Sequence, residues 1–99
     1  MAHARYADKR DLNEAELVQA LRVMGCHVWK LGREICDLLV LCPDGRTELA
    51  EVKNPERNWE LTDNEENTRR LLLSKGRRLW ILQTGEDCAR LVQNVKPAR

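Results

Sequence analysis

The sequence has no long hydrophobic run and no apolar leader. Hydrophobic residues make up 42% of its 99 residues and charged residues 33%, which is typical of a globular chain rather than a disordered one. No apolar stretch approaches the roughly 20 residues that cross a bilayer. The first residues, Met-Ala-His-Ala-Arg-Tyr-Ala-Asp, lack the hydrophobic core of a secretion signal. We therefore expect a cytoplasmic protein without a membrane partner.

Closely spaced cysteine pairs are absent too. The cysteines form no C-x-x-C pair and have no histidine at zinc-finger intervals. Most of them lie within apolar patterns that favour strands. We expect reduced thiols in the core at all four positions, which are Cys26, Cys36, Cys42 and Cys88.

Neither sign of charge is in excess, since the formal net charge is +1. This balance alone does not favour a nucleic-acid partner. The basic residues nevertheless gather locally, at Lys9-Arg10, Lys30 with Arg33, Arg69-Arg70, and Lys75 with Arg77-Arg78. Such clusters would suit a basic groove, although runs of charge are most often solvated helix faces.

Periodicity and turn residues predict the order α-β-β-β-α-β-α within one domain, because the chain shows no repeat and no linker. Residues 1–10 lack periodicity and are expected to be a flexible N-terminal arm, residues 11–95 the folded domain, and residues 96–99 a C-terminal tail. Helices are expected from residue 11 to a stop at Gly25, from the capping box Thr62-Asp63-Asn64-Glu65 to Gly76, and after Gly85. Strands are expected at residues 26–31, 36–42, 47–53 and 77–83.

Residues 35–53 are predicted to form a hairpin that carries two unusual carboxylates. The turn is Pro43-Asp44-Gly45-Arg46, where proline presets φ and glycine supplies a left-handed position. Asp37 is a lone carboxylate at the head of an apolar arm, which is costly unless something compensates it. On the second arm, Glu51 and Lys53 share one face of the strand.

The register of this hairpin decides what the carboxylates can do. A register centred on the turn brings Asp37 to the same end of the ladder as Glu51, whereas a slip of one residue would put them on opposite faces. In the favourable register the two carboxylates and the carbonyl of Val52 make half of a shell for a hard cation, with Lys53 beside it. In the alternative, Glu51 and Lys53 form a surface ion pair, and Asp37 is a charged residue at the strand edge that hinders aggregation. Neither then has a catalytic role.

Glu14 is a further carboxylate at an unusual position. At 100° per residue it falls in the middle of the apolar arc defined by Leu17, Val18 and Leu21 on the first helix. A carboxylate there is paired with a basic residue, reaches water at the helix end, or ligates a cation. Because Glu14 lies in the predicted first turn, the helix dipole alone could accommodate it.

These residues, taken in order, resemble the PD-(D/E)XK nuclease superfamily, and within it the stand-alone VRR-NUC domains common in bacteriophages. The likeness lies in Asn13-Glu14, Asp37 and Glu51-Val52-Lys53 and spans about residues 10–93. It implies an α/β fold: a single restriction-endonuclease-like domain with an αβββαβ core, in which helices flank a mixed sheet. The chain departs from the pattern at Cys36, where the superfamily has proline, and at Glu65 or Glu66, where members often carry glutamine.

The resemblance implies a metal-dependent endonuclease that hydrolyses phosphodiester bonds with Mg²⁺ or Mn²⁺. Asp37, Glu51 and the Val52 carbonyl would bind the metal, and Glu14 would reach it directly or through water. Lys53 would orient the attacking water or stabilise the phosphorane charge. Glu65 is first a capping residue and only a weak candidate for the site.

The implied substrate is DNA, with branched or structured forms such as Holliday junctions or flaps favoured, in a bacterial or phage-infected cell. A short chain has a small core and little surface to grip a duplex, so we expect a homodimer. The residues expected to bind nucleic acid are Lys30, Arg33, Arg57, Arg69, Arg70, Arg77 and Arg78. The alternative is a non-catalytic nucleic-acid-binding or assembly module on the same fold.

Overall fold

The computed structural model describes residues 2–32, 34–56 and 59–95, with side chains described from residue 13 onward within these ranges. The elements follow the predicted order. They are α1 (Ala2–Val23), β1 (His27–Lys30), β2 (Leu38–Leu41), β3 (Thr47–Val52), α2 (Asp63–Ser74), β4 (Leu79–Leu82) and α3 (Gly85–Gln93). No helix in the described part of the chain is long and apolar enough to span a membrane. The predicted tail at residues 96–99 lies outside the described residues.

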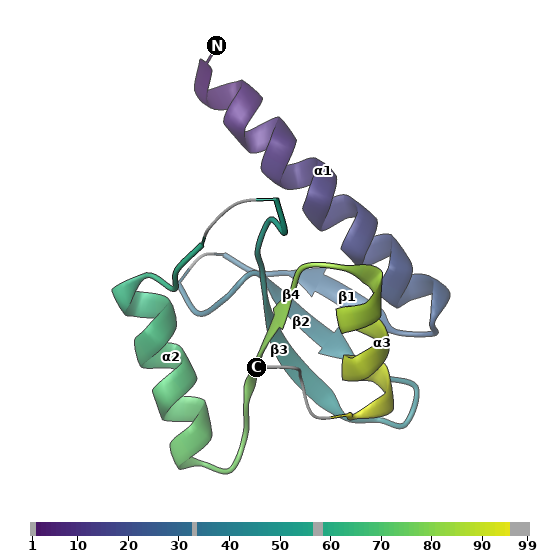
Figure 1. Ribbon diagram of the computed structural model, residues 1–99. Helices are drawn as coiled ribbons and strands as arrows, with labels where there is room; N and C mark the ends of the chain where they lie inside the picture. The colour runs from purple at the N-terminus through teal and green to yellow at the C-terminus, as the bar shows by residue number, and fades with distance from the viewer. Residues whose placement is uncertain (1, 33, 57–58, 96–99) are drawn as a thin grey trace.

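Helix α1 is longer than the sequence predicted. It begins at Ala2 instead of residue 11, so the backbone of residues 2–10 is helical where an arm without regular structure was expected. In Figure 1 this part of α1 extends beyond the sheet. A helical segment that packs on no sheet needs no apolar stripe, so periodicity does not reveal it. Residues 2–10 also contain no glycine or proline to end a helix.

The strands form one mixed sheet in the order β1-β2-β3-β4. Strands β1, β2 and β3 pair antiparallel, and β3 pairs parallel with β4. Helix α2 makes the crossover between the two parallel strands, because such strands cannot be joined by a tight turn. Figure 1 shows α2 on one side of the sheet and α1 with α3 on the other. The predicted α/β fold with helices flanking a mixed sheet is confirmed.

The hydrophobic core lies between the sheet and the helices α1 and α3. Alternate residues of the central strands, such as Val40 and Ala50, point into it and meet Leu21 and Leu91 from the two helices. The opposite set of strand residues, which includes Glu51, therefore faces α2. All four cysteines are free and buried, as predicted. Burial raises the pKa of the Cys88 thiol to about 12, so this group is an inert core thiol.

The turn between β2 and β3 depends on one glycine. Gly45 has φ of 91°, and its N–H donates to the carbonyl of Cys42 at 2.9 Å. We expect Gly45→Ala to lower the free energy of unfolding by about 1 kcal/mol, because a Cβ is strained in left-handed backbone. Urea unfolding of both proteins measures the difference.

Gly85 provides the matched control. A Cβ would meet no atom within 4 Å at either glycine, and only Gly45 has a positive φ. Gly85→Ala at the first position of α3 should therefore leave the unfolding midpoint unchanged or raise it slightly. Equal losses at the two positions would contradict a backbone cause.

Candidate active site

The β2–β3 register places Asp37 beside Glu51. Leu38 pairs with Ala50, so the next step along the ladder sets Asp37 opposite Glu51, on the face that looks toward α2. The carboxylate Oδ2 of Asp37 also accepts a hydrogen bond from the backbone N–H of Val52 at 2.9 Å. This is the register that the sequence left open, and it brings the two carboxylates onto one face.

Glu51 lies in a buried cluster of acids. Its exposed fraction is 2% and that of Asp37 is 5%, and its carboxyl group interacts electrostatically with those of both Asp37 and Glu65. Burial and then the neighbouring Asp37 carboxylate raise the pKa of Glu51 to about 9, with a smaller effect from Glu65. Burial and the neighbouring acids therefore favour the protonated form of Glu51 in the metal-free cluster.

Lys53 is held by three hydrogen bonds, one of which joins its side chain to this cluster. Its ammonium Nζ lies 2.9 Å from Oε1 of Glu65 on α2. Its backbone N–H donates to the carbonyl of Leu82 on β4 at 3.0 Å, and its carbonyl accepts from the Asn13 side-chain amide on α1 at 3.2 Å. Elements from both layers of helices thus hold the residue that follows β3.

Glu65 reaches the site because of the capping box that opens α2. Thr62 is the N-cap, and its hydroxyl accepts from the Glu65 N–H while the Glu65 carboxylate accepts from the Thr62 N–H. Burial opposes ionisation of Glu65, but the Thr62 N–H and the Lys53 ammonium outweigh it and lower the pKa of this carboxyl. The sequence predicted this cap, but the contact between Glu65 and Lys53 becomes visible only in the folded structure.

The donor set of this cluster fits a hard divalent cation. The Val52 N–H points at Asp37, and in a strand the carbonyl of a residue points to the same side as its N–H, so the Val52 carbonyl faces β2 as well. Two carboxylates and a carbonyl suit Mg²⁺ or Mn²⁺, which keep several waters. No group of three or more His, Cys, Asp or Glu side chains in the described residues forms a ready-made metal cage. The fit thus rests on a partial protein shell.

Glu14 is held differently from the other acids. Its Oε2 lies 3.7 Å from the ammonium of Lys30 on β1, and its side chain is 13% exposed. Pairing with a basic residue, one of the three possibilities that the sequence left open for Glu14, is therefore present. A role for Glu14 as a metal ligand stays a prediction.

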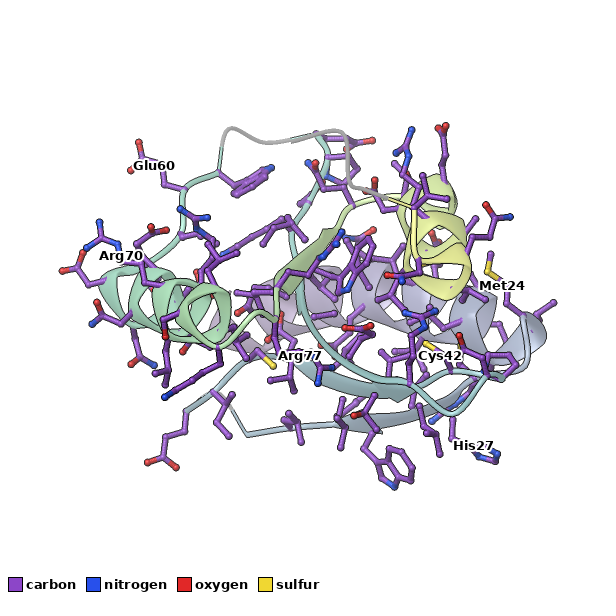
Figure 2. All side chains as sticks on the ribbon, turned by 90° about the horizontal axis from the view of Figure 1, so that it is seen from below. Met24, His27, Cys42, Glu60, Arg70 and Arg77 are labelled. Atoms are coloured by element: carbon purple, nitrogen blue, oxygen red, sulfur yellow. The ribbon has the colours of Figure 1, made fainter. Side chains whose placement is uncertain are left out.

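The arginines expected to bind nucleic acid have several different partners within the protein. Arg69 and Arg70 both pair with Glu66 on α2, and in Figure 2 Arg70 points away from the sheet. Arg77 contacts Glu48 and the Thr47 carbonyl. Arg78 lies over the Trp80 ring, with its Cζ atom 4.9 Å from the ring centroid. Arg33 and Arg57 lie outside the described residues.

The protein is thus a small α/β domain with an acidic cluster at the end of its parallel pair of strands. No protein-family model and no curated protein matches the chain. A solved structure described as a VRR_NUC domain superposes with a TM-score of 0.70 at 20% identity, covering 89% of this chain and 98% of that one. The chain therefore has the fold of a VRR_NUC domain, and the resemblance drawn from the sequence is confirmed at the level of the fold.

Proposed function

We propose that this protein is a divalent-metal-dependent endonuclease of the PD-(D/E)XK type that hydrolyses phosphodiester bonds in DNA. The observation that carries the proposal is the buried contact between Asp37 and Glu51 beside Lys53, at the end of the β3 strand of a VRR_NUC fold. Two neighbouring acids sequestered from water are costly to ionise together unless a cation compensates them. Their position therefore favours a binding role over a structural one.

The residues of the site would divide the chemistry among them. Asp37, Glu51 and the Val52 carbonyl would hold the ion, which would lower the pKa of a bound water and neutralise charge on the phosphate. The Val52 N–H fixes one oxygen of Asp37, so the carboxylate is oriented before any ion arrives. Lys53 would direct its ammonium at the attacking water or at the negative charge that develops on phosphorus.

The substrate and the assembly complete the proposal. A domain of 99 residues offers little surface for gripping a duplex, so a symmetric homodimer would set two sites against two strands. Branched or flap DNA, in which strands diverge, suits such a pair of sites. The alternative, a non-catalytic binding module, would use Arg69, Arg70, Arg77 and Arg78 on phosphates. The first three of these side chains have carboxylate partners, which argues against it.

A cleavage assay tests the proposed function. Four-way, flap, single-stranded and linear DNA are incubated with the protein in Mn²⁺, in Mg²⁺ and in EDTA. We expect cleavage that requires the metal, is fastest on a branched substrate, and falls about 100-fold in Lys53→Ala. Metal-independent DNA binding without cleavage, lost on substitution of Arg69 and Arg70, would instead establish the binding module.

A further inference from the structure

Glu65 contacts two parts of the protein that have different tasks. One oxygen, Oε1, accepts from the Thr62 N–H at 2.8 Å and from the Lys53 ammonium at 2.9 Å. The carboxyl group also interacts electrostatically with that of Glu51. The first contact completes the helix cap, and the other two belong to the acidic cluster. A single side chain therefore joins the first turn of α2 to the site.

Burial makes the contact with Lys53 more than a surface ion pair. The side chains of Lys53 and Glu65 are 16% and 14% exposed, so water screens the pair weakly. Lysine has a long flexible stem and no fixed geometry of its own. An ammonium held on two sides, by its strand and by Glu65, loses that freedom before the substrate arrives.

We propose that Glu65 is a positioning residue, which holds the Lys53 ammonium beside Asp37 and Glu51 and thereby couples the docking of α2 to the geometry of the site. The catalytic part of this statement rests on the proposed nuclease function. The positional part concerns Lys53 and α2 only, and it can be measured without cleavage.

The sequence supplies variants that separate the roles of Glu65. Glutamine can replace glutamate in a capping box, so Glu65→Gln keeps the cap and removes the charge that binds Lys53. Thr62→Ala removes the hydroxyl that accepts from the Glu65 N–H and leaves the charge. Glu66→Gln changes the neighbouring acid, which pairs with Arg69 and Arg70, and serves as the matched control.

The first measurement is the rate at which an amine-reactive acylating reagent labels Lys53, read by peptide mass spectrometry against the exposed Lys75. We expect Lys53 to be protected in the wild type, and its labelling to rise on the order of 5-fold in Glu65→Gln, because a charge-assisted bond becomes a neutral one. Thr62→Ala should lower the melting temperature without exposing Lys53. Glu66→Gln should change neither.

The second measurement is cleavage kinetics. Loss of positioning lowers kcat and leaves KM unchanged in Glu65→Gln, whereas a rise in KM alone would make Glu65 a DNA contact and overturn the proposal. Unchanged Lys53 labelling in Glu65→Gln would overturn it as well, as would equal labelling in Glu65→Gln and Thr62→Ala. If the wild type cleaves no DNA, the nuclease function fails while the labelling result still decides the position of Lys53.

Discussion

Glu51→Gln is expected to reduce metal-dependent cleavage on the order of 1000-fold and, at the same time, to stabilise the metal-free protein. The first effect follows because a neutral amide is a poor ligand for a hard cation. The second follows from the buried acidic cluster, in which burial and Asp37 raise the pKa of Glu51 to about 9. Glutamine has the shape of the protonated acid and needs no proton to fold.

The sign of this stability effect depends on pH. Because the folded-state pKa of Glu51 is raised above its ordinary value of 4.5, the folded state must take up a proton at any pH between these values, and stability falls as pH rises toward 9. Glu51→Gln should therefore gain little stability at pH 4.5 and more at pH 8, by up to about 1.4 kcal/mol for each pH unit between them. Thermal and urea unfolding in EDTA at both pH values measure the gain.

Glu86→Gln is the control for this substitution. The Glu86 side chain on α3 is 74% exposed and pairs with Arg90 at the surface, so its replacement should change stability by less than about 0.5 kcal/mol at either pH. A loss of stability in Glu51→Gln at pH 8 would contradict the strain assigned to the cluster.

Arg46→Ala is expected to lower the free energy of unfolding by about 3 kcal/mol, because it leaves a buried carboxylate without its main partner. Arg46 binds Asp44 and Glu48, each at 2.7 Å. It also donates to the carbonyls of Leu91 and Val92, at 3.1 and 2.7 Å, near the end of α3. Glu48 is only 7% exposed, so water cannot replace the lost guanidinium.

A double variant separates the loss of the Glu48 ion pair from the loss of the hydrogen bonds to α3. Arg46→Ala with Glu48→Gln also removes the buried charge that Arg46 balanced, and should recover part of the loss seen in Arg46→Ala by urea unfolding. The remainder reports the missing bonds to the carbonyls of α3. If the double variant is no more stable than the single one, the buried charge of Glu48 is not the cause.

Local pattern was enough to predict the elements, and their order is confirmed. The capping box at Thr62 and the left-handed turn at Gly45 are both present, because each depends on neighbours in the chain. Residues 2–10 of α1 escaped prediction because a helix that projects past the sheet carries no apolar stripe. Hydrophobic periodicity reports burial against the core, so it does not reveal a helical segment that extends beyond the sheet.

The site could be predicted only in part, since its residues come together through the register and the crossover. The sequence placed Glu51 and Lys53 on one face but could not choose the register that sets Asp37 opposite Glu51. The contact of Glu65 with Lys53 needs α2 to return across the sheet, and no local pattern encodes that approach. No local pattern predicts the bonds between Arg46 and α3 either, because their partners lie 45 and 46 positions further along the chain.

The β2–β3 pairing also constrains how long this hairpin can be. An inserted residue that shifted the register by one would reverse the face to which each side chain of one arm points. Either Asp37 or Glu51 would then point into the hydrophobic core. Inserting two and shifting the register to match would restore the face but slide one carboxylate along the ladder by roughly 7 Å, too far for both to bind the proposed ion. The register that this turn sets therefore keeps the two acids side by side, and a turn that shifted the register would separate the pair.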